Sequence, residues 1–314
     1  MQRKTTEPRM ATYLHRKGRM LGLPTSGNFE ITARCNFSCP MCYVHMSADE
    51  VSKQGKELTA QQWIKFAEDA KNKGMVFALI TGGEPFLRKD FFEIYGAMKK
   101  MGLVVSINSN GSMLDGEIFD KLIADPPFRM NISLYGGCNE TYEKMCGQPA
   151  YQRVLDNILR LKEKGVDICI NLSITPYNCD DLEKIYDFII ENQIQVRASS
   201  YMYPPARLDK ELEGYGNRLS PEDSAKYSVQ WDKLRFTEEQ FQARAEAIQN
   251  LVSVEPEECY IDQEETFDGV RCRAGSSSFW MTWDGEMRPC AFRFVLTISM
   301  PLTWQKSSRT LLIR

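Results

Sequence analysis

The stretch Cys35-Asn36-Phe37-Ser38-Cys39-Pro40-Met41-Cys42 places three cysteines within eight residues. The alternating run 28–33 before it predicts a β-strand, so the cysteines follow the end of a strand. Thiolates this close in sequence converge on one metal centre when the backbone loops around it. Three thiolates from one loop suit an iron–sulfur cluster that keeps one iron open.

A zinc site is the alternative for this stretch. His45 stands three residues after Cys42. With the three cysteines it would complete a Cys3His set of the kind that binds Zn²⁺ tetrahedrally. Small zinc sites are common, so these residues alone leave iron and zinc both open.

The composition limits the classes of partner. The 314 residues carry 39 basic and 42 acidic side chains, a formal net charge of −3. This balance gives no general basic field, so we expect neither nucleic acid nor a membrane as a partner. The chain has no run of about eighteen apolar residues. Its polar, basic N-terminus lacks the apolar core of a signal peptide, so we expect a cytoplasmic protein.

The cysteine count points to metal rather than to disulfides. Ten cysteines are many for structural thiols, and the chain is too long and apolar to need a disulfide framework. Most of them fall into two groups, near residue 40 and between residues 259 and 290. Short spacings of this kind in an intracellular protein indicate metal binding.

Strands and helices alternate after the cysteine loop. Short apolar runs predict strands, and the segments between them have helical periodicity and often end at glycine. The predicted strands are 28–33, 75–81, 103–108, 128–134, 166–172 and 194–199. The predicted helices between them are 60–73, 90–100, 115–124, 151–164 and 180–192. This alternation predicts a parallel sheet with right-handed crossovers. Six strands are too few for a closed eight-stranded barrel, so we expect a partly open (β/α)6 barrel.

A second motif, Thr81-Gly82-Gly83-Glu84-Pro85, ends the second predicted strand. It lies at the same edge of the predicted sheet as the cysteine loop. Glycines let the backbone approach a small ligand, and a carboxylate can hold an ammonium group. Such a turn is common by itself. Next to C-x3-C-x2-C it favours one shared site and makes zinc the weaker alternative.

The two motifs together resemble those of the radical SAM enzymes. The resemblance implies that Cys35, Cys39 and Cys42 hold three irons of a [4Fe–4S] cluster, and that S-adenosylmethionine (AdoMet) chelates the fourth iron. Reduction would cleave AdoMet to methionine and a 5′-deoxyadenosyl radical that abstracts hydrogen from a substrate. A low-potential electron donor of the flavodoxin or ferredoxin type is implied as a partner, and a partial TIM-like barrel as the fold.

The resemblance also implies contacts to AdoMet. By it, Glu84 and the backbone of Gly82 and Gly83 would bind the amino group. Asn108 begins the turn Asn108-Ser109-Asn110-Gly111, which resembles the Thr-Asn-Gly turn of the family. Ser133, near the end of the fourth predicted strand, matches a serine that contacts the ribose or the carboxylate. An ordinary strand-end turn is the alternative at Asn108 and at Ser133.

Two positions depart from the family pattern. Met41 stands where an aromatic residue usually precedes the third cysteine, and its polarizable sulfur could pack on adenine. Cys146 stands before Gly147 where an arginine is common. The contact to the AdoMet carboxylate is therefore unassigned, with Lys144 as a weak candidate.

A third constellation contains Cys272 and Cys290. A hairpin that turns at Asp284-Gly285 would bring both thiolates to one end. The spacing resembles the opening of the SPASM or twitch extension, which binds auxiliary iron–sulfur clusters. Cys259 could add a ligand, but no cysteine follows Cys290, and residues 294–314 contain no Asp or Glu. We expect an incomplete extension and an auxiliary cluster that is possible but short of ligands, with truncation and a naturally short tail both open.

The sequence thus predicts four parts. They are an N-terminal basic arm (1–27), a radical SAM core (28–216), a helical linker (217–258) and a shortened SPASM-like extension (259–314). The resemblance implies a maturase that acts on a ribosomal peptide or a protein side chain. A sulfatase maturase, a small-molecule enzyme and a damaged paralogue are alternatives. A zinc-binding interaction protein is the alternative from another class.

Overall fold

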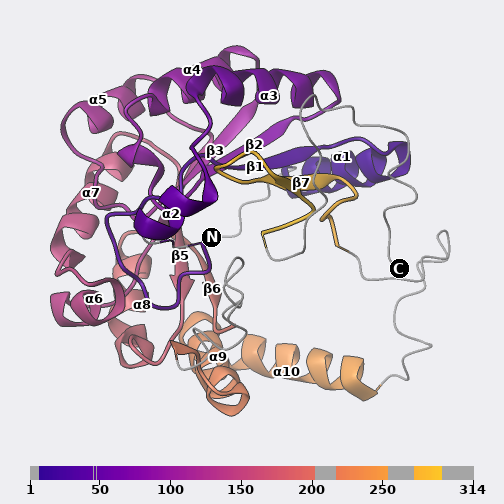
Figure 1. Cartoon of the computed structure of the whole chain (residues 1–314). Helices are drawn as coiled ribbons and strands as arrows, with labels where there is room; N and C mark the ends of the chain where they lie inside the picture. Colours follow the sequence, from indigo (N-terminus) through magenta and orange to yellow (C-terminus); the bar gives the residue numbers. More distant parts are fainter. Residues whose placement is uncertain (1–6, 45, 47, 202–216, 254–271, 292–314) are drawn as a thin grey trace.

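A curved, mostly parallel sheet forms the centre of the computed structural model (Figure 1). The structure describes residues 7–44, 46, 48–201, 217–253 and 272–291. The strands are β1 (Ser26–Glu30), β2 (Phe77–Thr81), β3 (Val104–Ser109), β4 (Arg129–Ser133), β5 (Ile168–Ser173), β6 (Gln195–Ser199), β7 (Ser278–Met281) and β8 (Met287–Arg288). Their order across the sheet is β6-β5-β4-β3-β2-β1-β7-β8, and β7 with β8 is the antiparallel pair. The predicted parallel α/β fold is confirmed.

The helices between successive strands run along the outside of the curved sheet (Figure 1). The α-helices are α1 (Glu7–Leu21), α2 (Ala48–Gln54), α3 (Ala60–Asn72), α4 (Phe91–Lys100), α5 (Gly116–Ala124), α6 (Asn139–Cys146), α7 (Tyr151–Glu163), α8 (Leu182–Glu191), α9 (Pro221–Arg235) and α10 (Glu238–Ser253). Two short 3-10 helices are η1 (Pro85–Leu87) and η2 (Cys179–Asp181). Each predicted strand and helix of the core agrees with an observed one to within about two or three residues, the usual uncertainty of element ends.

Aromatic packing joins α3 to the sheet. Phe29 of β1 makes edge-on contacts with Trp63 and Phe66 of α3, with ring centroids 6.1 and 5.6 Å apart. It makes a third such contact with Phe279 of β7, at 5.9 Å. These rings lie on the helix-covered face of the sheet. The alternate residues of β1 therefore face the open, concave side.

Local signals explain where α3 begins. Thr59 is the N-cap, and it forms a reciprocal capping box with Gln62. Such a box satisfies two backbone donors that the first helical turn leaves unpaired. Thr59 immediately precedes the helix that the sequence predicts over residues 60–73.

Three helices lie where none was expected. The basic N-terminus was expected to be an arm, and the structure instead has α1 there. Its buried face is made of small or polar residues such as His15 and Gly18, so the sequence carries no apolar stripe. The short helices α2 and α6 were missed as well. The sequence of α2 is polar, and α6 is only 8 residues long.

The C-terminal hairpin belongs to the main sheet. β7 pairs with β1 in parallel, with Ser26 opposite Ser278 and Phe29 opposite Met281. The chain then turns at Gly285, which has φ +97°, and β8 returns antiparallel to β7. Glycine suits this turn because other residues seldom adopt positive φ. The predicted hairpin at Asp284-Gly285 is confirmed, and the sheet has two strands more than the six that were expected.

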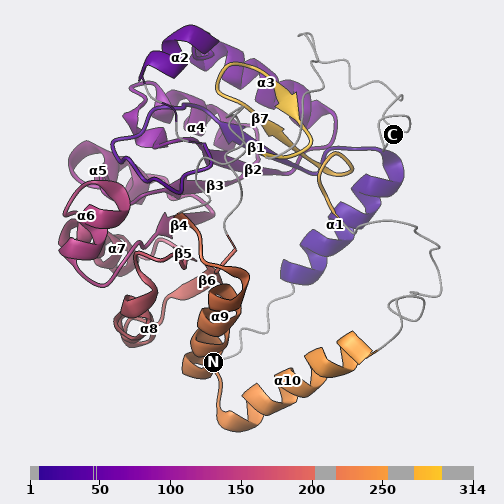
Figure 2. The same cartoon turned by 60° about the horizontal axis from the view of Figure 1, so that its bottom comes forward.

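Helices α9 and α10 occupy part of the predicted linker. α9 packs near α8, where Trp231 contacts Tyr186 edge-on at 6.1 Å. α10 extends away from the sheet in both views (Figures 1 and 2). The boundaries of the four predicted parts stay predictions. In the described part of the chain, none of the helices has the length and apolar content needed to span a bilayer.

His15 anchors α1 to the sheet. Its Nδ1 lies 2.9 Å from the hydroxyl of Ser277, just before β7, and its ring stacks on Phe77 of β2. Burial first, and then the positive charges of Arg273 and Arg19, lower the pKa of His15 to about 4. The folded chain therefore keeps this imidazole neutral over a pH range in which the unfolded chain would protonate it.

We expect the protein to lose stability as the pH falls from about 6.5 to about 4, because the unfolded chain then binds a proton that the folded chain excludes at His15. This contribution is fully present above the unfolded pKa and amounts to about 2–3 kcal/mol. Denaturant unfolding at several pH values measures it. A His15→Asn variant should lack this part of the pH dependence, and an unchanged slope would contradict the assignment.

Candidate active site

The cysteine loop leaves the sheet beside the Gly-Gly-Glu-Pro turn. Past β1, the backbone N–H of Ile31 donates to Thr81 O at 2.9 Å. The N–H groups of Gly83 and Glu84 donate in turn to Thr32 O at 2.9 Å and Arg34 O at 2.8 Å. These bonds continue the β1–β2 ladder beyond the sheet. They bring the two motifs side by side, as the sequence predicted.

Gly82 and Gly83 are required by this close approach. A Cβ atom on Gly82 would lie 2.6 Å from the carbonyl oxygen of Thr32, and one on Gly83 would overlap that of Arg34. Neither backbone oxygen can move without breaking the ladder. The N–H groups of Gly83 and Glu84 are used there, so a ligand at this turn would meet carbonyl oxygens. Such oxygens suit a donor such as an ammonium group.

Glu84 is a fully buried carboxylate that joins the ends of β2 and β3. Its Oε1 accepts from the N–H of Phe86 at 3.2 Å, and its Oε2 from the N–H of Asn110 at 2.8 Å. The hydroxyl of Ser109 lies 3.1 and 3.0 Å from the two oxygens. Burial raises the pKa of Glu84 to about 7, and these hydrogen bonds oppose the rise.

Asn110 connects β3 to the cysteine loop. Its side-chain Nδ2 donates to Asn36 Oδ1 at 2.8 Å and to the Sγ of Cys35 at 3.8 Å. Its Oδ1 accepts from the N–H and the hydroxyl of Ser112 at 2.9 and 2.7 Å. Gln148 holds the same loop from the other side, by donating to Asn36 O at 2.6 Å.

Arg88 fixes the segment that follows β1 and leads into the cysteine loop. Its buried guanidinium donates to Ile31 O at 2.8 Å and to Leu58 O at 2.9 Å. Asp90 accepts two further hydrogen bonds from it, at 2.9 and 2.7 Å. A buried guanidinium needs such partners, because an unpaired charge is costly away from water. The segment that enters the cysteine loop is thus fixed on both sides.

The three loop thiols lie within electrostatic range of one another. Burial raises the pKa of Cys35 to about 11, although the N–H of Phe37 and the side chain of Asn110 donate to its sulfur. A hydrogen bond with the Cys146 thiol, followed by burial, raises the pKa of Cys39. The charges of Cys42 and Cys35 act in the same direction on Cys39. Soft thiols gathered in this way release their protons when they bind metal.

This donor set fits an iron–sulfur cluster. Cys35 accepts two N–H groups, as cluster thiolates do, and three thiols from one loop leave a fourth iron position open. In the described part of the chain, no three His, Cys, Asp or Glu side chains are arranged to share a single metal ion. His45, the fourth ligand of the zinc alternative, lies outside the described residues.

The other predicted cofactor residues lie around the same edge. Met41 is buried beside the cysteines. Ser133 lies at the end of β4, and the ring of nearby Tyr135 lies 6.3 Å from that of Phe37 in the loop. Asn108 lies one row deeper, where its Oδ1 accepts from Asn131 at 2.9 Å. Their contacts with AdoMet stay predictions.

Sequence analysis did not single out Ser109 and Asn110. Both belong to the turn that resembles Thr-Asn-Gly, and Ser109-Asn110-Gly111 is the part of it that contacts Glu84 and the cysteine loop. The resemblance to the Thr-Asn-Gly turn therefore identified the correct segment, but not the residue within it that contacts the loop. Strand alternation does not separate Asn108 from Asn110, because Asn110 lies beyond the end of β3, where the turn sets the direction of its side chain.

The cysteines outside the loop lie in different parts of the fold. Cys272 is exposed before β7, and Cys290 follows β8. Their segments meet at one end of the hairpin, since a Cβ on Gly275 would lie 3.3 Å from Pro289. Cys146 is fully buried, and its thiol donates to Tyr142 O at 2.8 Å. Cys259 lies outside the described residues.

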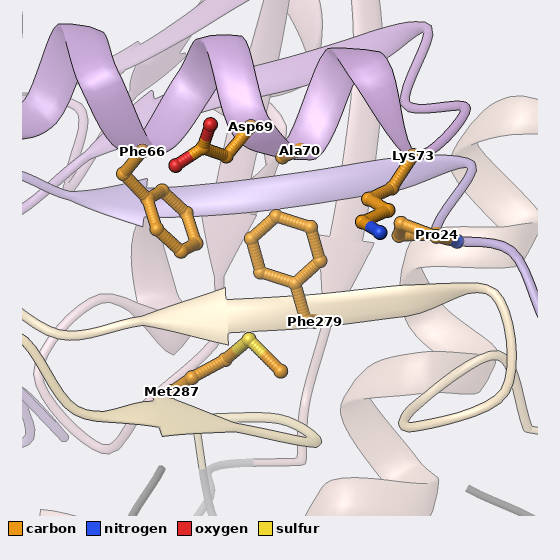
Figure 3. A pocket seen from close by; sticks show the side chains of 7 residues that line it. All are labelled: Pro24, Phe66, Asp69, Ala70, Lys73, Phe279 and Met287. Carbon is orange, nitrogen blue, oxygen red and sulfur yellow. The ribbon is translucent and has the colours of Figure 1, made fainter. Parts of the chain in front are cut away.

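A small hollow lies between α3 and the C-terminal hairpin (Figure 3). Phe66, Phe279 and Met287 form its apolar lining, and Asp69 and Lys73 stand on α3 above it. None of the predicted site residues lines it, so it is a feature of the packing between α3 and the hairpin.

Comparisons with known proteins agree with this geometry. The chain is 29% identical to an AdoMet-dependent heme synthase of Methanosarcina barkeri over 205 residues, which cover 65% of this chain and 56% of that protein. The chain spans about half the length of the curated relatives it matches.

Two solved structures share the fold. Streptococcus suis SuiB bound to its precursor peptide SuiA matches 96% of this chain and 67% of its own, at 17% identity and a TM-score of 0.65. The AdoMet-bound enzyme anSMEcpe matches 87% of this chain and 76% of its own, at 18% identity and a TM-score of 0.61.

The family model described as the radical SAM superfamily matches residues 29–189, just over half of the 314 residues. That range contains the cysteine loop, the Gly-Gly-Glu-Pro turn and strands β2 to β5. The cofactors expected from the sequence, a [4Fe–4S] cluster and AdoMet, are those that this family uses. The chain belongs to the radical SAM superfamily.

Proposed function

We propose that this chain cleaves AdoMet reductively and uses the resulting radical to modify a peptide or a protein side chain. The observation that carries the proposal is the alignment of Cys35, Cys39 and Cys42 beside the Gly-Gly-Glu-Pro turn at one edge of the sheet. A [4Fe–4S] cluster held by Cys35, Cys39 and Cys42 would supply the electron for the reductive cleavage of AdoMet to methionine and a 5′-deoxyadenosyl radical. A flavodoxin- or ferredoxin-type protein in the cytoplasm would supply this electron to the cluster.

The residues around the loop have separate tasks in this proposal. Cys35, Cys39 and Cys42 hold three irons. The carbonyl groups of Gly82 and Gly83 and the carboxylate of Glu84 receive the amino group of AdoMet. Met41, Asn108 and Ser133 complete the cofactor pocket, and Cys272 and Cys290 offer two ligands to an auxiliary cluster.

The concave face of the sheet supports a polar substrate. Asn108, Asn131, Ser133, Asn171 and Arg197 share this face through the parallel register of β3 to β6. The Oδ1 of Asn131 is buried and lacks a hydrogen-bond partner among the described residues. A buried acceptor of this kind favours a ligand that brings an N–H or O–H donor. Peptide groups and hydroxyl side chains both supply one.

The structural neighbours favour a peptide over a small molecule. SuiB was solved with a precursor peptide, and anSMEcpe with a peptide named Kp18Cys. The relatives named for heme synthesis and for a GTP 3′,8-cyclase support a small-molecule substrate as the second candidate. The asparagines of the concave face favour the peptide candidate, because the amide groups of a peptide can form hydrogen bonds with asparagine side chains.

Metal content tests the proposal directly. After anaerobic reconstitution we expect about four irons per chain, and about eight if an auxiliary cluster also assembles. A Cys35→Ala/Cys39→Ala/Cys42→Ala variant should lose about four of them. Iron and zinc are measured by elemental analysis, and 5′-deoxyadenosine is measured after reduction with AdoMet present.

The matched control is Cys272→Ala/Cys290→Ala. It should keep the first four irons and the cleavage of AdoMet, because its cysteines lie on the hairpin rather than in the loop. Zinc in place of iron, or AdoMet cleavage that survives the triple substitution, would reject the proposed function.

Replacement of Glu84 tests the second motif. In Glu84→Gln, one carboxylate oxygen is replaced by an NH2 group. This group then faces hydrogen-bond donors that are paired with the carboxylate in the unchanged protein. We expect unfolding free energy to fall by about 1–3 kcal/mol. AdoMet affinity should fall by about tenfold or more, because an ammonium–carboxylate contact is lost. Denaturant titration and calorimetric titration with AdoMet measure the two effects.

Glu93→Gln is the control for this experiment, since it replaces an exposed carboxylate on α4. It should change neither quantity. A Glu84→Gln protein that loses stability but binds AdoMet normally would show that the carboxylate only joins β2 to β3.

A further inference from the structure

We propose that Asn110 is a positioning residue that raises the reduction potential of the loop cluster through an N–H···S hydrogen bond to Cys35. The inference rests on the proposed function, because it requires Cys35 to bind an iron. It extends that function by naming a residue that controls how easily the cluster accepts its electron.

The contacts of Asn110 fix the direction of its amide group. The residue is 5% exposed, and its Oδ1 accepts two hydrogen bonds from Ser112. Because Oδ1 is held in this way, Nδ2 must point the other way, toward Asn36 Oδ1 and Cys35 Sγ. If the side-chain amide of Asn110 were rotated by about 180°, its N–H groups would face the N–H of Ser112, and two donors would be opposed. The donor to sulfur is therefore specified by its surroundings.

The backbone of Asn110 is equally constrained. Its N–H donates to the buried Glu84 carboxylate at 2.8 Å, and the N–H of Gly111 donates to the Ser109 hydroxyl at 3.0 Å. The amide thus sits on a turn that is anchored to the end of β2. A donor held this firmly loses little entropy when it binds an acceptor.

The electrostatic consequence follows from the charge change on reduction. An electron added to the cluster increases the negative charge on its sulfur atoms. A fixed N–H dipole that points at the Cys35 sulfur stabilises the more negative state more than the oxidised one. Hydrogen bonds to sulfur are among the features that set the potentials of iron–sulfur clusters. Loss of the Asn110 donor should therefore make the cluster harder to reduce.

The experiment compares anaerobically reconstituted variants by redox titration with EPR detection. In Asn110→Asp, the acceptor oxygen and the shape are kept while the donor is replaced by an acceptor. Its ratio of reduced to oxidised cluster at a fixed potential should fall by about tenfold, and that of Asn110→Ala by about threefold. The iron content of both should stay near that of the unchanged protein.

Gln148→Ala is the matched control. It removes a contact of the cysteine loop at Asn36 O, but its side chain touches neither Asn110 nor a cysteine sulfur. It should keep the ratio of reduced to oxidised cluster within about twofold of that of the unchanged protein. An equal shift in this control would show that loop loosening is the cause, and an unchanged potential in both Asn110 variants would reject the inference while leaving the proposed function intact.

A measurement on the unchanged protein covers the case in which the Asn110 variants fail to fold. Selective ¹⁵N labelling of asparagine side-chain amides should give a ¹⁵N coupling in pulsed EPR spectra of the reduced cluster. The absence of this coupling would overturn the inference. Failure of the unchanged protein to assemble any cluster would instead reject the proposed function, and the inference with it.

Discussion

The buried carboxylate of Glu84 is the interaction on which the site geometry depends. It accepts hydrogen bonds from three residues on two loops, and it does so where water cannot replace them. The turn after β2 and the turn after β3 are thereby held at one separation. The cysteine loop is attached to both, through backbone bonds to Gly83 and Glu84 and through the side chain of Asn110. Three segments that are distant in sequence thus behave as one rigid frame.

This frame separates two tasks that a flexible loop would combine. The first is to keep three thiols close together although their burial and mutual repulsion favour the protonated state. The second, under the proposed function, is to present the polar residues of the concave face to a substrate. Arg88, Glu84 and Asn110 serve the first task through their hydrogen bonds to the loop and to the strand ends. The polar residues of β3 to β6 remain available for the second.

Much of the core could be predicted from the sequence because its signals are local. Apolar runs between glycines identified the buried strands, and helical periodicity over residues 60–73 identified α3. The adjacency of the cysteine loop and the Gly-Gly-Glu-Pro turn followed from parallel topology, since consecutive strands end at the same edge. The radical SAM resemblance added the cofactors, which no composition or periodicity would supply.

The features that sequence analysis missed depend on contacts across long distances in the chain. The buried face of α1 is recognisable only against Ser277 and Phe77, because His15 and Gly18 are not typical core residues. The pairing of β7 with β1 joins residues about 250 positions apart. In the third turn, Asn110 rather than Asn108 reaches the loop, and this follows from side-chain direction rather than from residue type.

The pairing of β7 with β1 also has a consequence for biosynthesis. β1 leaves the ribosome early, whereas its neighbour on one side is made only when residues 278–281 emerge. Until then one edge of β1 has unsatisfied N–H and C=O groups, and such edges template intermolecular pairing. This edge of the nascent core therefore stays open until residues 278–281 have emerged. A chaperone that covers the edge would lower the risk of aggregation before the sheet is complete.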